Sequence, residues 1–577
     1  MRALREDLVS SGWGVEAVAD LLGEAAVAAL HREIRLPALR AVRAALAESR
    51  DAGTAPSPVA VLTALFMLGE PVAAGELDAA LPRTRTTGAL AMGLVLPTEH
   101  DGHDEPGDTE SALPRSGPVS RSAAGASAVP SAGSEPAGAG VGVPAAPVAS
   151  PAASAFDSEP PAAVRVRAAV DLRPHETVDD AGDVRWWVAS DLGELTTGCE
   201  LAPDHVLGIG GAGLTLASLT PREPVATAVD LGCGCGIQTL YLLRHAERVT
   251  ATDISARALA FTAFNAALAG TEPDRLELIR GSFLEPLSGR AFDLIATNPP
   301  FVLTPPAVRE AGLPLMEYRD AGGPVLPALV PAVGEHLRPG GIAVMLGNWE
   351  HRHAQDWREH VRAWLPDDLD AWVIQRERQD PVEYAAMWLR DGGTAPERDE
   401  TAFNARLGAW IDDFAARGVE AIGLGYLVLH RPALDDRRRR PWRVLEEVST
   451  APPGPLGGHV AQVLAMRSRL AGMSDDDVAA LHPVVAPDVT QERHLRPGAS
   501  DPTVILIRQG GGLGRVVRAD TALAALVDVA DGELSVAQIA AAVAALTGLT
   551  GADAGALHAD LVAAVRALAS DGFLTFS

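Results

Sequence analysis

The sequence contains no lysine, so all 48 of its basic residues are arginine. Aromatic residues make up only 4% of the chain, whereas hydrophobic residues, mostly Ala, Val and Leu, make up 47%. This bias is typical of translation from a GC-rich genome, so abundant arginine does not by itself indicate RNA binding. The formal charge of -27 excludes a protein that coats nucleic acid non-specifically, because such binding depends on many cationic contacts with phosphate.

Cysteine and long apolar runs are also scarce. The three cysteines, Cys199, Cys233 and Cys235, form no CxxC pair, so neither a zinc site nor a disulfide framework is predicted. The longest mainly apolar run, residues 59–69, is about half of the roughly 20 residues that a membrane span needs. The first residues lack the apolar core of a signal peptide. These features predict a soluble, cytoplasmic protein.

The chain divides into four regions by composition and periodicity. Apolar residues at helical spacing predict an N-terminal helical domain over residues 1–100. Residues 101–163 consist largely of Ala, Gly, Pro and Ser, and we interpret them as a flexible linker because they cannot bury enough apolar surface to fold. A third domain is predicted over 164–435. A C-terminal α+β domain over 436–577 follows, with a winged-helix-like arrangement as one interpretation.

The third domain alternates strands and helices. Between the strands lie helical stretches, of which the clearest is predicted to begin after an N-cap at Ser255 and to end at Gly270. Such alternation predicts an α/β fold, a doubly wound parallel sheet with helices on both faces. The predicted strands are 225–231, 248–253, 276–280, 292–298, 341–346, 370–375 and 421–430.

A glycine-rich turn follows the first of these strands. After Asp230, the alternate residues Gly232, Gly234 and Gly236 allow the backbone to turn sharply and to approach a ligand where a Cβ atom would clash. Asp253 ends the next strand, roughly 20 residues later, where a carboxylate can reach ribose hydroxyls. The two features together predict a nucleotide-type cofactor site.

The glycine spacing favours S-adenosylmethionine (SAM) over a dinucleotide. A GxGxxG turn would fit a pyrophosphate, but the turn ending at Gly236 is GxGxG, and SAM has no phosphates. A competing GxGxxG occurs at Gly208, Gly210 and Gly213, but its preceding strand is short, and its acid would be Asp230 of the better turn. We predict that this second loop borders the SAM pocket and helps to close it.

The segment Asn298-Pro299-Pro300-Phe301 begins at the last residue of the predicted strand 292–298. An amino nitrogen conjugated to a π system is a poor nucleophile, and hydrogen bonds to two fixed acceptors can draw it toward sp3 geometry. Asn298 offers a side-chain carbonyl and Pro299 a backbone carbonyl, while Pro300 helps to hold the loop rigid. Phe301 offers a flat face for a planar substrate. We interpret these four residues as catalytic.

The runs VDLGCGCG, ATDIS and FDLIATNPPFV resemble the class I SAM-dependent methyltransferases. More narrowly, they resemble the branch whose Asn/Asp-Pro-Pro-Tyr/Phe motif methylates amino groups of adenine, guanine or glutamine. The resemblance covers about residues 190–432, and implies a Rossmann-like methyltransferase domain over 164–435 with SAM as cofactor and no metal. It also places Ile254, Ser282, Phe283 and Asn298 in contact with the cofactor, although relatives commonly carry an acid where Ser282 stands.

Three hypotheses describe what the chain acts on. The first is an exocyclic amine of a base in ribosomal or transfer RNA, which the flanking domains could help to dock. The second is the carboxamide of a protein glutamine, as in the release-factor methyltransferases. The third is a SAM-binding interaction scaffold without activity. Substrate-side residues are expected in 304–323, which includes Tyr318, Arg319 and Asp320.

Two further patterns are given a structural interpretation. His351, His353 and His360 could be spaced as metal ligands, but without cysteine partners or an HExxH pattern they are predicted to lie on a polar helix face. The arginine run 437–440 follows two aspartates and is predicted to be a solvated charged segment.

Overall fold

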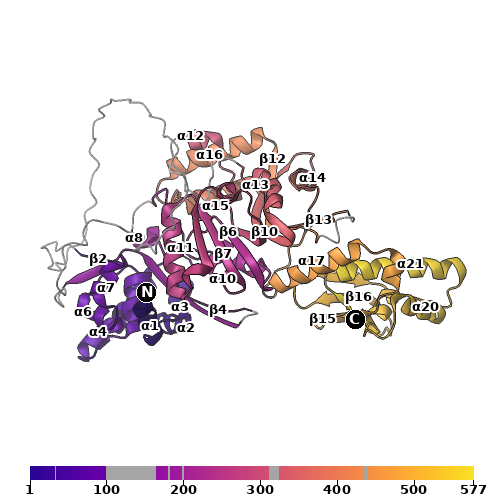
Figure 1. Cartoon of the computed structure of the whole chain (residues 1–577), viewed down its shortest axis with the longest axis horizontal. Coiled ribbons are helices and arrows are strands. Elements are labelled where there is room, and N and C mark those ends of the chain that lie inside the picture. The colour runs from indigo at the N-terminus through magenta and orange to yellow at the C-terminus, as the bar shows by residue number, and fades with distance from the viewer. Residues whose placement is uncertain (33, 99–163, 180–181, 198–200, 311–323, 434–439) are drawn as a thin grey trace.

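The computed structural model describes the chain except for residues 33, 99–163, 180–181, 198–200, 311–323 and 434–439. The predicted linker, Cys199 and the segment with Tyr318, Arg319 and Asp320 therefore lie outside the described residues. An N-terminal helical module, a central sheet covered by helices, and a C-terminal region follow one another along the longest axis of the molecule (Figure 1).

The N-terminal module packs short helices around a small antiparallel sheet. Its sheet has the order β1-β3-β2, from β1 (Val72–Ala73), β2 (Val95–Pro97) and β3 (Arg165–Ala168). Because β3 comes after residue 163, this module uses residues that the sequence had assigned to the next domain. The helices are α1 (Arg2–Ser10), α2 (Val15–Leu22), α3 (Glu24–Leu30), α4 (Leu36–Asp51), α5 (Pro58–Leu62), η1 (Thr63–Met67), α6 (Ala74–Ala80) and α7 (Arg85–Ala91).

A long hairpin connects this module to the central domain. Its strands β4 (Asp171–Asp179) and β5 (Gly182–Ser190) pair along their whole length. The indole Nε1 of Trp187 on β5 donates a hydrogen bond of 2.8 Å to the carbonyl of Trp13 in the N-terminal module. The helices α8 (Glu194–Thr197) and α9 (Gly211–Leu219) follow before the central sheet begins.

The central sheet has eight strands in the order β13-β11-β12-β10-β9-β6-β7-β8. β12 runs antiparallel to both of its neighbours, and every other pair is parallel. This arrangement confirms the predicted doubly wound α/β fold. The strands are β6 (Val225–Leu231), β7 (Ala246–Asp253), β8 (Leu276–Arg280), β9 (Phe292–Thr297), β10 (Leu337–Arg352), β11 (Asp370–Gln379), β12 (Val419–His430) and β13 (Arg443–Glu447).

Helices cover both faces of the sheet, so its strands are apolar on both sides. Alternate residues of β10 belong to two separate cores, with Val344 in one and Met345 in the other. Among the described residues, no helix is both long enough and apolar enough to cross a membrane. The elements are α10 (Ile237–Leu242), α11 (Ala256–Ala269), η3 (Pro273–Arg275), η4 (Glu285–Leu287), α12 (Pro306–Glu310), α13 (Leu326–Val333), η5 (Gly334–His336), α14 (Trp357–Arg362), α15 (Pro381–Asp391) and α16 (Glu400–Ala416).

Two end signals of α11 are confirmed. The Ser255 hydroxyl accepts a hydrogen bond from the Ala258 N–H, as an N-cap does, and Gly270 ends the helix in the left-handed conformation with φ of 87°. These local contacts fix where the helix begins, directly after the end of β7.

The order of the strands creates a crevice at the carboxyl ends of β6 and β9. The chain runs from β6 outward through β7 to β8, and then returns to place β9 on the other side of β6. Leu231 and Thr297 are register partners at the carboxyl ends of β6 and β9. In open α/β sheets, ligands bind at such a switch point, outside the carboxyl ends of the strands.

The C-terminal region adds helices and two small sheets. β13, which lies after the predicted boundary at 435, pairs in parallel with β11 and so belongs to the central sheet. The winged-helix-like arrangement of this region stays a prediction. The elements are α17 (Gly457–Ala471), α18 (Asp475–Ala479), β14 (Pro483–Val485), β15 (Val489–Leu495), β16 (Pro502–Gln509), β17 (Val516–Ala519), α19 (Thr521–Asp528), α20 (Val536–Thr547), α21 (Gly551–Ser570) and β18 (Leu574–Phe576).

The helical prediction for two of the histidines is wrong. His351 lies on β10, where its Nε2 is 2.7 Å from Oε1 of Gln375, and His353 follows that strand. Pairing with β12 extends β10 to Arg352, well past the apolar residues that signalled a strand. Of the three histidines, His360 alone lies on a helix, α14.

Candidate active site

A cavity of about 330 Å³ lies at the carboxyl edge of the sheet, at the switch point. Gly236 and Pro299 are not among its lining residues, and Phe301 lines a second cavity. Most of the predicted site residues do come together here. The lining includes Asp230, Gly232, Gly234, Asp253, Ile254, Ser282, Phe283, Asn298 and Pro300.

The glycine turn presents bare backbone to this cavity. Gly232 and Gly234 have φ values of 75° and 54°, and a Cβ atom added to either would meet nothing within 4 Å. Side chains there would strain the backbone and project into the open space of the cavity. At Gly236, by contrast, an added Cβ would lie 3.0 Å from the Cα of Thr262, so this glycine permits close packing against α11.

Two side chains of α11 hold the glycine turn by hydrogen bonds to its carbonyls. Asn265 is fully buried, and its Nδ2 donates to the carbonyls of Cys235 (2.7 Å) and Ala189 (2.8 Å). Thr262 donates from its hydroxyl to the carbonyl of Gly234 at 3.0 Å. Sequence reasoning missed both residues, although two polar side chains three positions apart in a mainly apolar helix were a usable signal. Together they fix the turn to the helix and to β5.

Asp253 is bound to the turn as well. Its Oδ2 accepts the Gly234 N–H at 3.0 Å, and its Oδ1 accepts the Ser255 N–H at 2.9 Å. A carboxylate oxygen has two lone pairs, so each oxygen can accept one further hydrogen bond from a ligand. Burial raises the pKa of this carboxyl above its ordinary value.

Asp230 lies deeper, at the end of β6. Its side chain is 1% exposed, and the hydroxyl of Thr239 donates to its Oδ2 at 2.7 Å. Burial raises the pKa of Asp230 to about 7. A cationic group placed beside it would favour the ionised form.

The charges of the cavity suit a cation. Asp204, Asp230 and Asp253 line it, and no arginine is among the described residues of its lining. A pyrophosphate would meet carboxylates here, which argues against the dinucleotide alternative. SAM instead carries a sulfonium and an ammonium group, so the residues present fit it. Ser282, where the family resemblance led us to expect an acid, stands on the lining.

A loop before α9 forms another wall of the cavity. This loop, residues 204–210, and the first turn of α9 together include all three glycines of the competing GxGxxG, and these line the cavity. Asp191 anchors the loop by accepting the Val206 N–H at 2.9 Å, and it also accepts the Nε of Arg257 at 2.8 Å. Asp204 and His205 on this loop are lining residues that the sequence analysis did not identify.

Asn298 follows the last residue of β9. Thr297 donates from its hydroxyl to the carbonyl of Leu231 at 2.8 Å, which fixes this strand end against β6. The Oδ1 atom of Asn298 is buried and has no hydrogen-bond partner among the described residues. A buried acceptor left unpaired costs about 1–3 kcal/mol, which a ligand with an N–H donor would recover.

A second cavity of about 370 Å³ lies on the other side of this segment. Asn298 and Pro300 line the first cavity, whereas Phe301 lines the second. The ring of Phe301 meets Trp388 of α15 edge to face, with 6.4 Å between the ring centroids. The other lining residues include Val302, Leu303, Leu326, Asn348, Glu350, Arg352, Trp364, Asp413 and Arg417. The predicted catalytic segment therefore lines both cavities, so a ligand in either one would lie beside it.

Two parts of the chain match known protein families. Residues 210–311 match the methyltransferase small domain, and residues 10–105 match a domain of unknown function, DUF7059. The first match includes the glycine turn, Asp253 and the segment Asn298–Phe301. It confirms the resemblance to methyltransferases that these motifs predicted.

Individual relatives match about a quarter of the chain. Over 169 residues the chain is 36% identical to the release factor glutamine methyltransferase of Moorella thermoacetica, covering 26% of this chain and 58% of the relative. Over 139 residues it is 27% identical to ribosomal RNA small subunit methyltransferase C of Alcanivorax borkumensis, covering 24% of this chain and 35% of the relative. The chain thus spans at most 58% of the length of these two curated relatives.

Among solved structures, the chain is similar to the 16S rRNA N2 G1207 methyltransferase of T. thermophilus, solved in complex with AdoMet and guanosine. The sequence identity is 19% and the TM-score 0.23, with 35% of this chain and 51% of the other covered.

Proposed function

We propose that this chain is a SAM-dependent N-methyltransferase that transfers a methyl group to a planar amino nitrogen. The observation that carries this proposal is the buried, unpaired Oδ1 of Asn298 on the wall of a cavity that suits SAM. The match of residues 210–311 to the methyltransferase small domain supports it.

The first cavity supplies the cofactor contacts in this proposal. SAM, when bound, provides a methyl group on a positively charged sulfur that is already activated for transfer. Asp253 would accept hydrogen bonds from ribose hydroxyls, and Asp230 would face the cationic end of the molecule. Gly232 and Gly234 would allow the ligand to approach the backbone, and Ile254, Ser282 and Phe283 would border its base.

The acceptor is held by the segment that lines both cavities. Its NH2 group would donate one hydrogen bond to Oδ1 of Asn298 and one to the carbonyl of Pro299. Both bonds draw the nitrogen toward sp3 geometry and direct its lone pair at the methyl group. When bound, SAM would supply the methyl group, the electron pair of its broken S–C bond would stay on sulfur, and the methylated nitrogen would lose a proton to solvent. Orientation of this kind accounts for much of the rate in such transfers.

The first candidate acceptor is an exocyclic amine of an RNA base, in ribosomal or transfer RNA. A base could stack against Phe301, which lines the second cavity. The similarity to a ribosomal RNA methyltransferase agrees with this candidate. The flanking regions could provide further contacts with a large RNA.

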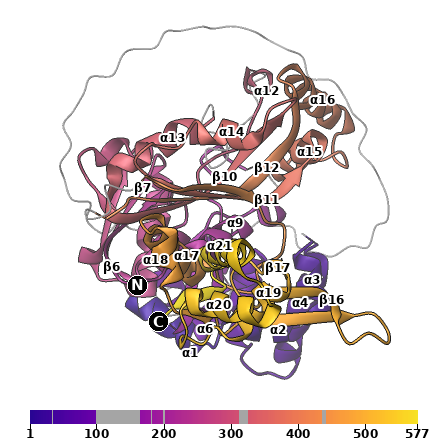
Figure 2. The same ribbon diagram turned by 90° about the vertical axis from the view of Figure 1, so that its right-hand side faces the viewer.

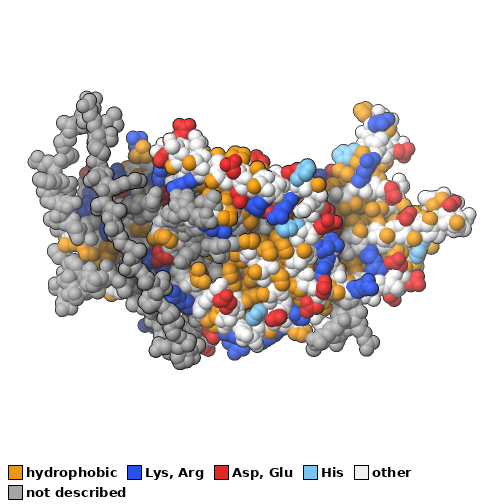
Figure 3. Space-filling view, turned by 90° about the horizontal axis from the view of Figure 1, so that it is seen from above, with side chains coloured by type: hydrophobic (Ala, Val, Ile, Leu, Met, Phe, Trp, Pro, Cys, Tyr) orange, Lys and Arg blue, Asp and Glu red, His pale blue; other side chains and the backbone are white. Residues whose placement is uncertain are grey.

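The second candidate is the carboxamide of a protein glutamine, and the acidic composition of the helix pair beside the second cavity favours it. Residues 381–420, which form α15, α16 and their flanks, contain eight acidic residues and four arginines. On the face in Figure 3, the described arginine side chains are interspersed with acidic ones. Phosphate contacts require unneutralised cations, so this surface offers an RNA backbone little attraction.

One experiment tests the function and separates the acceptors. Purified protein is incubated with tritiated SAM and an extract of cells that lack this chain, and the labelled product is treated with ribonuclease or with protease. Label released only by ribonuclease supports the RNA base, and label released only by protease supports the glutamine. Absence of protein-dependent label in every fraction, despite SAM binding, would favour the scaffold hypothesis.

A further inference from the structure

A helix pair is inserted beside the proposed catalytic segment. β11 and β12 are antiparallel neighbours that a short turn could join, but α15 and α16 lie between them in the sequence. The two helices gather with α12 at one end of the central sheet (Figure 2). Nothing in the family resemblance or the proposed chemistry assigns a role to this pair.

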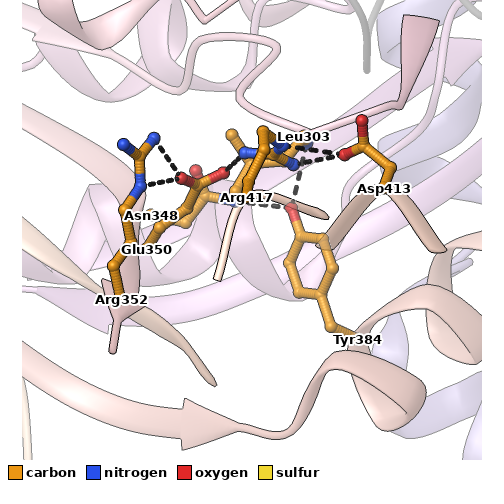
Figure 4. Close-up of polar contacts among 7 residues, drawn as sticks. All are labelled: Leu303, Asn348, Glu350, Arg352, Tyr384, Asp413 and Arg417. Carbon is orange, nitrogen blue, oxygen red and sulfur yellow. Dashed lines mark hydrogen bonds and ion pairs between the residues drawn. The ribbon is translucent and has the colours of Figure 1, made fainter. Parts of the chain in front are cut away.

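The hydroxyl of Tyr384 on α15 connects the pair to the catalytic segment (Figure 4). It accepts hydrogen bonds from the backbone N–H of Leu303 at 3.2 Å and from Nδ2 of Asn348 on β10 at 2.5 Å. Leu303 lies two residues after Phe301. The tyrosine therefore ties this end of the segment to both the helix pair and the sheet.

Aromatic packing leaves the Tyr384 ring little freedom. The side chain is fully buried, and its ring centroid lies 6.0 Å from that of Trp410 and 6.1 Å from that of Phe414. Trp388, one helical turn after Tyr384, contacts the Phe301 ring. α15 thus contacts the segment at both Phe301 and Leu303.

A charged cluster holds the other end of the helix pair to β10 (Figure 4). Glu350 is 6% exposed and accepts Nε and Nη2 of Arg352 at 2.8 and 2.6 Å, and it also pairs with Arg417. Arg417 in turn pairs with Asp413 of α16 at 2.6 Å. Because Glu350 lies two residues after Asn348 on β10, the same strand anchors both contacts.

We propose that Tyr384 and Asn348 are positioning residues that fix the segment Asn298–Phe301 for methyl transfer by holding the N–H of Leu303. The inference rests on the proposed function. The two prolines fix φ and contribute no N–H, so the segment behaves as a stiff unit whose orientation depends on where it is tied. A displacement of about 1 Å in such a unit can lower a rate on the order of 100-fold.

Tyr384 acts here as a neutral hydrogen-bonding group. Burial raises the pKa of its phenol well above the usual range, so the hydroxyl stays protonated at any working pH. Its contribution would therefore show in the maximal rate, and not in an acid–base limb of the pH profile.

The test compares Tyr384→Phe with Tyr241→Phe. The second substitution removes a comparable hydroxyl contact, 2.8 Å from Nε2 of His175, away from the segment. For Tyr384→Phe we expect the maximal rate of label transfer to fall roughly 10- to 100-fold. The affinity for SAM, and the amount of extract that gives half of the maximal rate, should not change. Tyr241→Phe should keep the wild-type rate. Equal rates in the two variants would overturn the proposal.

A second measurement does not depend on activity. Hydrogen–deuterium exchange of peptides that contain Leu303 should be faster in Tyr384→Phe than in wild type, and unchanged in Tyr241→Phe. If exchange at Leu303 does not change, the Tyr384 hydroxyl does not hold the Leu303 N–H, and the inference fails whatever the acceptor is. If wild type transfers no label while exchange responds as expected, the proposed function fails, but the hydrogen bond between Tyr384 and Leu303 is supported.

In a double-mutant comparison, Asn348→Ala should add little to the exchange caused by Tyr384→Phe, because both act on the same contact. Fully additive effects would show that Asn348 acts elsewhere, and would remove it from the positioning pair.

Discussion

Asp253 accepts the backbone N–H of Gly234 at 3.0 Å, so the acid at the end of β7 and the glycine turn after β6 form one unit. The sequence pointed to each as a separate cofactor contact. In the structure, the carboxylate also sets the shape of the turn, and loss of either partner should disturb both.

Replacement of Asp253 by alanine should therefore weaken SAM binding. The variant loses a charge-assisted hydrogen bond to the ribose, worth about 1–3 kcal/mol, and it also frees the turn. Isothermal titration with SAM measures the change, and Asp274→Ala serves as the control because Asp274 is an exposed acid outside the cavity. Equal affinities in the two variants would count against this pocket.

Asn298→Ala separates binding from transfer. The substitution removes the acceptor for the substrate NH2 group but leaves the glycine turn and Asp253 in place. We expect the affinity for SAM to stay close to that of wild type. The rate of label transfer should fall by roughly two or more orders of magnitude. Near-normal turnover would end the catalytic assignment of this segment.

Asp230 should make stability depend on pH. Burial raises its pKa to about 7, whereas the unfolded chain releases the proton near the ordinary value of 3.8. Between these two values the folded chain holds the extra proton, so its stabilising contribution is lost as pH rises from about 4 to about 7. The thermal midpoint of wild type should fall over this range relative to that of Asp230→Asn, which cannot titrate. Parallel curves for the two proteins would contradict the shift.

Asn265→Ala should destabilise the cofactor side of the domain. The substitution leaves the carbonyls of Ala189 and Cys235 and the N–H of Ala189 buried without their partner. Each unpaired group costs about 1–3 kcal/mol, so the thermal midpoint should fall clearly. Asn404→Ala, at an exposed position of α16, provides the matched control and should change the midpoint little.

Local patterns were enough to predict the strands around the cofactor site. The ranges 225–231 and 276–280 coincide with β6 and β8, and the other predicted ranges overlap the strands of the same sheet. These segments are short and bounded by turns, and the second half of β6 is buried, which leaves a direct signal in composition. The glycine turn, Asp253 and Asn298 follow strand ends, so the fold class alone places them at one edge.

Long-range contacts could not be predicted in the same way. No local pattern shows that Tyr384 reaches Leu303, because 81 positions separate them and the contact depends on how α15 packs. The extension of β10 to Arg352 depends on its pairing with β12, and polar residues such as Glu350 hide it. The support from Thr262 and Asn265 likewise becomes visible only when α11 lies against the turn.

The position of β13 limits where the chain can be truncated. Its pairing with Ala371–Gln375 satisfies the outer backbone groups of β11, although it comes from beyond residue 435. A truncation at 435 would leave those amides and carbonyls exposed along an apolar strand, a surface that recruits other chains and promotes aggregation. The central sheet and the C-terminal region therefore share a strand, and are expected to express and fold as a single unit.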